Sequence, residues 1–181
     1  MMLKRSVVTL AAMTACWFPG TAMAATSVAP VPAVSVPAGL LPMATSWQSP
    51  LSGIVLGYPS RGTGAKPYLL VTANGGRTWR SLPAPPVTYP ADNDQPDAIW
   101  TGGVIAVTDG THIVVTRDNG RNWSAERVPG GFYVAKLVIT SGRLFALLTS
   151  DTGTAVYSGP VGGALRAVRG LSVSGSLTYG D

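Results

Sequence analysis

The sequence has very few of the residues on which catalytic and metal sites usually depend. Cysteine, histidine and glutamate each occur once in the 181 residues, as Cys16, His112 and Glu126. One cysteine cannot form a disulfide within the chain, and His112 has no second histidine with which to share a metal. The sequence also has no GxSxG, P-loop, HExxH or CxxC pattern. We therefore expect no catalytic residues, no metal and no cofactor.

Charged residues are also scarce, at 12% of the chain. Lysine and arginine together number 13 against 8 acidic residues. This small basic surplus contains no run of basic residues and does not alternate with aromatic residues, as nucleic-acid-binding surfaces usually do. We expect no nucleic-acid partner.

The first 24 residues have the pattern of a secretory signal peptide. Lys4 and Arg5 precede an apolar stretch at residues 6–18, and small residues at Ala22 and Ala24 provide a cleavage site. The apolar stretch is too short for a stable transmembrane helix, so we expect an exported protein with no transmembrane segment. An alternative is a lipoprotein anchored through Cys16, although the bulky residues directly after this cysteine argue against it.

The rest of the chain is predicted to be all-β. Residues 25–44 are rich in proline and alanine and are predicted to form an extended tether before a domain at 45–181. Glycine (22) and proline (15) are abundant, which favours short strands joined by turns. β-branched and aromatic runs predict strands at 51–58, 68–72, 103–108, 112–116, 134–140, 144–149 and 154–158.

The most informative feature is an internal repeat. Residues 69–79 and 113–123 align without a gap at an offset of 44 residues. A third and weaker copy places Gly162 at 42 residues after Gly120. A period in the low forties is typical of one four-stranded blade of a β-propeller.

The two clearer copies resemble the Asp-box, or BNR, repeat, whose pattern is Ser/Thr-x-Asp-x-Gly-x-Thr-Trp. The first copy matches it with Thr72, Asn74, Gly76, Thr78 and Trp79. The second copy matches it with Thr116, Asp118, Gly120 and Trp123. Asn74 replaces the aspartate of the pattern and Asn122 replaces its threonine, while the third copy has Pro160 and Leu165 in place of the acid and the tryptophan.

The resemblance implies an incomplete β-propeller of three to four antiparallel blades, similar to sialidases, sortilin-like receptors and photosystem II assembly-factor-like proteins. A single β-sandwich is the alternative. In the family the box is a structural hairpin at the blade periphery, away from the binding face. We expect Asn74 and Asp118 to accept hydrogen bonds from backbone N–H groups two residues on. We also expect Trp79 and Trp123 to fold back and become buried.

Other candidate site residues are few. Asp92, Asp94 and Asp97 cluster in a long loop at 82–97, where three carboxylates could bind a cation such as Ca²⁺. Their spacing lacks the glycine and the final glutamate of an EF-hand, so a solvated loop is the simpler interpretation. His112 is interpreted as a strand-edge residue and Glu126 as part of an outer strand or loop.

These observations favour an exported, non-enzymatic binding or scaffolding module. Its partner would be a protein or glycan at the cell surface, contacted through loops such as 58–66 and 82–97. Open sheet edges could also allow self-association. The alternative is a sialidase-like glycoside hydrolase, either as a fragment or as an inactive relative, although the sequence lacks the expected tyrosine–glutamate nucleophile pair.

Overall fold

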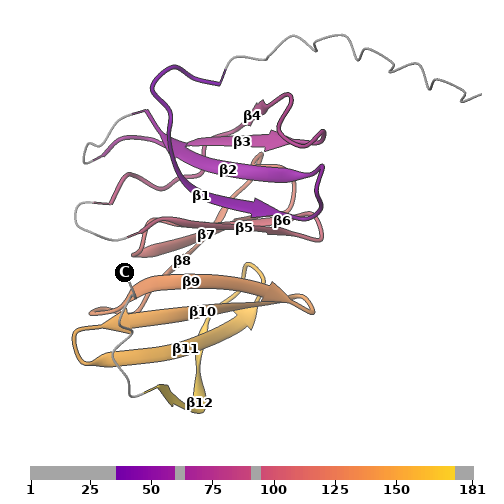
Figure 1. Ribbon diagram of the computed structural model, residues 1–181. Coiled ribbons are helices and arrows are strands. Elements are labelled where there is room, and N and C mark those ends of the chain that lie inside the picture. The colour runs from indigo at the N-terminus through magenta and orange to yellow at the C-terminus, as the bar shows by residue number, and fades with distance from the viewer. Residues whose placement is uncertain (1–35, 60–63, 91–94, 174–181) are drawn as a thin grey trace, which may run out of the picture. The chain divides into compact units, whose positions relative to one another are not determined.

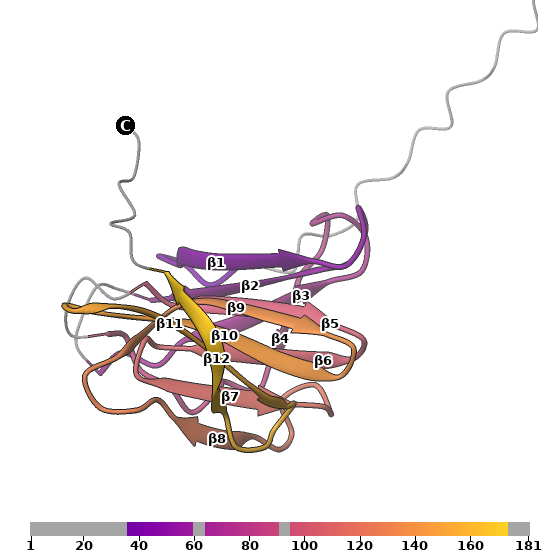
Figure 2. The ribbon, with the colours of Figure 1, turned by 90° about the horizontal axis from the view of Figure 1, so that it is seen from below.

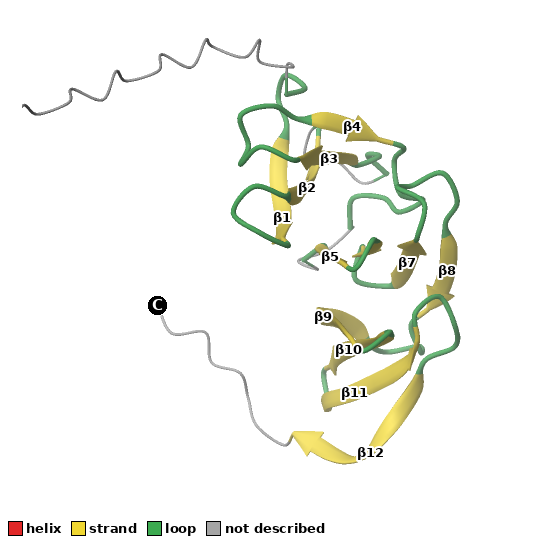
Figure 3. Cartoon of the chain, turned by 90° about the vertical axis from the view of Figure 1, so that its right-hand side faces the viewer, coloured by secondary structure: helices red, strands yellow, loops and turns green. Residues whose placement is uncertain are grey.

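The structure is a computed structural model that describes residues 36–59, 64–90 and 95–173. In this part of the chain it contains twelve strands and no helix (Figure 3). The predicted leader at 1–24 and most of the predicted tether at 25–44 lie outside the described residues. The described residues include no helix with the length and hydrophobicity that a membrane-spanning segment requires.

The twelve strands form three four-stranded antiparallel sheets, each built from consecutive strands (Figure 1). Sheet 1 contains β1 (Leu41–Trp47), β2 (Gly53–Tyr58), β3 (Tyr68–Thr72) and β4 (Arg80–Leu82). Sheet 2 contains β5 (Asp97–Thr101), β6 (Val104–Thr108), β7 (His112–Thr116) and β8 (Ser124–Arg127). Sheet 3 contains β9 (Tyr133–Thr140), β10 (Arg143–Ser150), β11 (Gly153–Pro160) and β12 (Arg166–Val173).

The sheets pack against one another in chain order. Strand β5 contacts β1 and β2 of sheet 1 and also contacts β9 of sheet 3 (Figures 1 and 2). Side chains alternate across each strand, so sheet 2 can bury one face against sheet 1 and the other against sheet 3. The prediction of an all-β, incomplete propeller of three to four antiparallel blades is confirmed, with three sheets among the described residues, and the alternative of a single β-sandwich is not observed there.

Each junction between sheets has its own apolar core. Between sheets 1 and 2 the fully buried residues include Ile54, Leu56, Leu69, Ile105 and Val107. Between sheets 2 and 3 a second core is made by Ala106, Ile113, Val115, Val134, Leu137, Leu144, Ala146 and Leu148. Neighbours in sequence, such as Ile105 and Ala106, therefore contribute to different cores.

The predicted strands are present, but five further strands were not predicted. These are β1, β4, β5, β8 and β12. Strand β1 begins at Leu41, so it includes the last residues of the segment expected to be a tether. Asp97, expected in the loop at 82–97, is the first residue of β5.

The antiparallel order gives each sheet two distinct ends. The repeated segments, turn 1 (residues 72–79) and turn 2 (residues 116–123), follow β3 and β7 at what we call the turn end. The tight turns between β5 and β6 and between β9 and β10 lie at the same end. The connections that follow β2 and β6 lie at the opposite end, which we call the loop end.

Candidate functional site

Turns 1 and 2 share one hydrogen-bond pattern, which starts from a buried threonine. The Thr72 hydroxyl accepts hydrogen bonds from the N–H groups of Asn74 and Gly76, at 3.3 and 2.9 Å. In turn 2 the Thr116 hydroxyl accepts from Asp118 and Gly120 at the same two distances, 3.3 and 2.9 Å. The two repeated segments therefore adopt matching conformations.

The third residue of each turn accepts a backbone hydrogen bond from further along the chain than expected. Asn74 Oδ1 accepts from Thr78 N–H at 2.9 Å, and Asp118 Oδ1 accepts from Asn122 N–H at 2.9 Å. The expectation that these side chains bind the N–H two residues on was wrong, because the threonine hydroxyl already accepts the near N–H groups. The side chain instead closes the whole turn.

Turn 2 holds its carboxylate in the ionised form. The N–H and side-chain amide of Asn122 both donate to Asp118, and the Thr116 hydroxyl adds a third hydrogen bond. These donors, led by the backbone N–H of Asn122, lower the pKa of Asp118 from 3.8 to about 2.

The tryptophan of each turn lies over the glycine of the same turn. A Cβ added to Gly76 or Gly120 would lie 3.4 Å from the ring of Trp79 or Trp123, respectively. Both glycines have positive φ, at 82° and 83°, which other residues adopt only with strain. Trp123 packs on the core between sheets 1 and 2, and its Nε1 is buried without a hydrogen-bond partner among the described residues. The expected burial of Trp79 and Trp123 is met only in part, because both side chains are half-buried. In both turns the recurring side chains bind or cover the turn's own backbone.

The structure describes only one of the three aspartates of the predicted loop site. Asp92 and Asp94 lie outside the described residues. Asp97 is buried, and its carboxylate accepts hydrogen bonds from Lys136 Nζ at 3.0 Å and from Leu137 N–H at 2.9 Å. Both of its oxygens therefore join sheet 2 to sheet 3. No group of three or more potential metal-binding side chains occurs in the described part of the chain.

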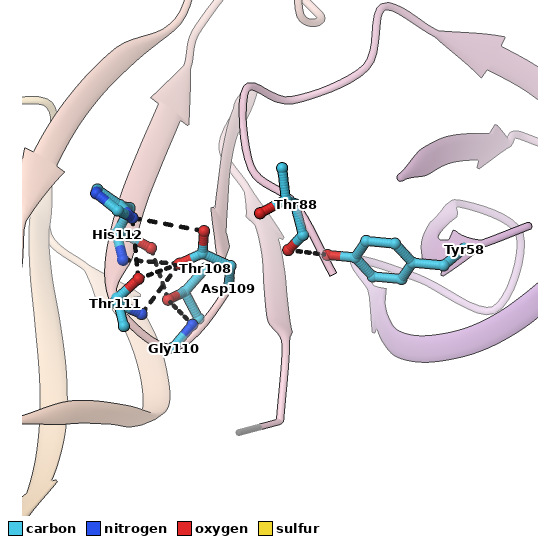
Figure 4. Close-up of polar contacts among 7 residues, drawn as sticks. All are labelled: Tyr58, Thr88, Thr108, Asp109, Gly110, Thr111 and His112. Atoms are coloured by element: carbon cyan, nitrogen blue, oxygen red, sulfur yellow. Dashed lines mark hydrogen bonds and ion pairs between the residues drawn. The ribbon is translucent and has the colours of Figure 1, made fainter. Parts of the chain in front are cut away.

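The loop end carries a second buried carboxylate, Asp109, which directly follows β6. Its Oδ1 accepts hydrogen bonds from the N–H groups of Thr111 and His112, at 3.0 and 2.8 Å, and from the Thr111 hydroxyl (Figure 4). Nothing in the sequence indicated that this aspartate would be buried. Its main role is to hold the β6–β7 turn.

Tyr58 ends β2 and lies at the same end of sheet 1. It is fully buried, and its hydroxyl donates to the Thr88 carbonyl at 3.2 Å (Figure 4). Burial raises the pKa of Tyr58 well above its ordinary value of 10.0, and the nearby Asp109 carboxylate raises it further. Tyr89 packs edge-on against Tyr58 with ring centroids 5.0 Å apart. Tyr58 is therefore held neutral and anchors the segment that joins sheets 1 and 2.

His112 does not form a proton relay with its neighbours. Its Nδ1 lies 3.0 Å from the Thr111 hydroxyl and 3.5 Å from Asp109 Oδ2, so both groups meet the same ring nitrogen (Figure 4). A relay of the serine-hydrolase kind needs the acid on one nitrogen and the hydroxyl on the other. The His112 side chain is 43% exposed and opens β7, as the sequence predicted.

A cleft of about 290 Å³ opens beside His112 at the loop end. Its walls include Arg127, Phe132 and Tyr133, and Tyr133 is 42% exposed. The cleft contains no carboxylate, so it offers hydrogen-bond donors and aromatic faces rather than an acid–base pair. Glu126 lies on β8 next to Arg127, in the outer strand expected for it.

Comparisons with known proteins show a likeness in fold only. No protein-family model matches the sequence, and no curated protein matches it. Among solved structures, the chain is similar to "Phage phi92 endosialidase", with a TM-score of 0.50 and 12% sequence identity. The match covers 67% of this chain and 23% of that one. At this identity the match supports a sialidase-like β fold for this chain and nothing about its function.

Proposed function

We propose that this chain is an exported, non-enzymatic binding or scaffolding module that engages a protein or glycan at the cell surface. Turns 1 and 2 are, in this proposal, Asp-box hairpins of a sialidase-like or assembly-factor-like propeller. Their matching hydrogen bonds and the fold likeness to an endosialidase support that assignment. The signal-peptide pattern at 1–24 supports export.

One observation carries the proposal of binding over catalysis: the buried carboxylates are used to hold the backbone. Asp97 accepts a hydrogen bond from one backbone N–H group and Asp109 from two, and each carboxylate is nearly enclosed. A glycosidase needs two carboxyl groups that face a substrate about 5–10 Å apart. The side chains that do face the loop-end cleft are donors and aromatic rings, which suit recognition of a sugar or a peptide.

The ligand is proposed to bind at the loop end. The cleft beside His112 contributes Arg127 and Tyr133. The described residues of the loops at 58–66 and 82–97 begin at the same end of the sheets, after β2 and β4. Residues 60–63 and 91–94 of these loops lie outside the described residues. Self-association through open sheet edges, such as the outer strand β4, remains part of the proposal.

The test is capture of a glycan or a cell-surface protein by the full chain, together with a turnover assay on a fluorogenic sialoside. We expect capture without turnover, and we expect Tyr133→Ala or Arg127→Ala to weaken capture. Arg166→Ala, an exposed arginine on β12, is the control and should capture normally. Turnover that is abolished by Glu126→Gln would overturn the proposal.

A sialidase-like glycoside hydrolase, as a fragment or an inactive relative, is the second candidate. The specific observation in its favour is the likeness to an endosialidase, of which this chain matches 23%. On this alternative the remaining blades would supply the catalytic residues. A lipoprotein anchored through Cys16 is the corresponding alternative for localisation, and it predicts that the mature chain partitions into detergent.

A further inference from the structure

A second and larger cleft, of about 500 Å³, lies at the turn end between sheets 2 and 3. It is separate from the loop-end cleft of the proposed function, so the inference drawn from it stands independently. Two tight turns form its walls, Gly102-Gly103 between β5 and β6 and Ser141-Gly142 between β9 and β10. Arg117, the second residue of turn 2, projects into it from sheet 2.

Arg117 is the single charged residue that lines this cleft. Its Nη2 donates a hydrogen bond to the Val161 carbonyl at 2.8 Å, which holds the guanidinium against sheet 3. Arg117 forms no ion pair with a carboxylate in the described part of the chain. A guanidinium that is held by a neutral carbonyl keeps its full positive charge and most of its five N–H donors for another ligand.

The other polar groups around the cleft are uncharged. The hydroxyls of Thr101, Thr140 and Ser141 line it, and none of them takes part in a side-chain hydrogen bond among the described residues. Ser141 has a φ of 49°, which is uncommon for a residue other than glycine. A Cβ added to Gly102, Gly103 or Gly142 would meet nothing within 4 Å, so these turns border open space.

We propose that this cleft binds a tetrahedral oxyanion, a phosphate or sulfate group, between Arg117 and the two glycine-containing turns. An arginine side chain pairs with such a group through two parallel N–H donors, and backbone N–H groups at turns add further donors. The Asp118 carboxylate lies in an adjoining cleft of about 480 Å³ and is already bound by Thr116 and Asn122. No carboxylate lines the proposed oxyanion cleft, so no negative charge in that cleft would repel the oxyanion.

The repeat itself restricts the site to one junction between sheets. Turn 1 has Ala73 at the position where turn 2 has Arg117. The conserved hydrogen bonds of the two turns do not involve this side chain, so the turn folds without the arginine. A substitution at Arg117 is therefore expected to leave turn 2 intact.

The experiment is a titration of the ¹⁵N-labelled full chain followed by NMR, with sodium phosphate and sodium sulfate in separate arms. Sodium chloride at equal ionic strength is the control. We expect saturable shifts at Gly102, Gly103, Ser141 and Gly142 with at least one of the two oxyanions and none with chloride. The arm that saturates at lower concentration distinguishes phosphate from sulfate.

Two variants test the role of the arginine. Arg117→Gln removes the charge and shortens the side chain while keeping a polar amide, and it should weaken binding about tenfold or more. Arg121→Ala removes an exposed arginine of turn 2 that does not line the cleft, and its binding should be unchanged. Shifts that stay linear to high concentration, or that are the same in Arg117→Gln, would overturn the proposal. Melting temperatures of both variants check that the fold is retained.

Discussion

The side-chain amide of Asn122 donates a hydrogen bond to Asp118 Oδ2 at 2.6 Å, and this contact reverses the one found in the other turn. In turn 1 the amide belongs to the third residue, Asn74, whose Nδ2 donates to Thr78 Oγ1 at 2.8 Å. Each turn departs from the Asp-box pattern at one position. Each nevertheless pairs a side-chain donor with a side-chain acceptor between its third and seventh residues. The two departures therefore preserve the closing contact.

This relationship predicts the effect of removing the acceptor in turn 1. Thr78→Val leaves the Asn74 amide without its partner and should lower the free energy of unfolding by about 0.5–1.5 kcal/mol. Thr78→Ser keeps the hydroxyl and is the matched control, with a smaller loss. Urea denaturation followed by tryptophan fluorescence measures both. Equal losses in the two variants would show that the hydroxyl contributes nothing.

The low pKa of Asp118 predicts a pH-dependent contribution to stability. Because its pKa is lowered to about 2 in the folded chain, the ionised form is favoured by folding. The contribution should be complete above the ordinary value of 3.8 and should disappear as the pH falls towards about 2. The stability difference between the native sequence and Asp118→Asn should therefore narrow across this range. A difference that stays constant from neutral pH to pH 2 would contradict the assignment.

The link between sheets 2 and 3 predicts unequal effects for its two partners. Asp97→Ala leaves the Leu137 N–H buried without an acceptor and should cost about 1–3 kcal/mol. Lys136→Ala should cost at most about 1 kcal/mol, because the lysine side chain is 63% exposed. Hydrogen exchange at the Leu137 amide separates the two, since it should accelerate in Asp97→Ala and not in Lys136→Ala. Acceleration in both variants would mean that the ion pair, not the backbone contact, joins the sheets.

The sequence predicted the central strands well, because their apolar residues alternate or form short buried runs. Strands β4 and β8 were not predicted, since only Leu82 in β4 is buried and β8 has no buried residue. Their pairing is fixed by the turns before them and not by their own composition. Strand β1 was hidden by the proline-rich composition of the segment that precedes it.

The site was predicted less completely than the fold. The two repeated turns were found because their threonine, glycine and tryptophan residues recur at fixed spacing. Asp109 and Tyr58 were not singled out, because their burial depends on contacts with segments distant in sequence, such as Thr88 for Tyr58. The third copy was also weak for a structural reason. Its closing pair is Ser158 with Arg166, which makes that turn one residue shorter than turns 1 and 2.

The packing of the Trp47 side chain in sheet 1 leads to the last prediction. The Trp47 ring lies across Gly53, where an added Cβ would come within 2.5 Å of it. The ring also packs edge-on against Trp79, with centroids 6.1 Å apart. Gly53→Ala must therefore displace the Trp47 ring and disturb its contact with Trp79.

We expect Gly53→Ala to cost about 1 kcal/mol, at the low end of the usual range for overpacking, because Trp47 is 46% exposed and can swing towards solvent. The tryptophan emission should shift to longer wavelength. Gly130→Ala is the control, since a Cβ there meets nothing within 4 Å and its φ is not positive. In a Trp47→Ala background the cost of Gly53→Ala should vanish, because the clash has been removed. A cost that persists in that background would place the strain in the backbone of β2 instead of at the indole.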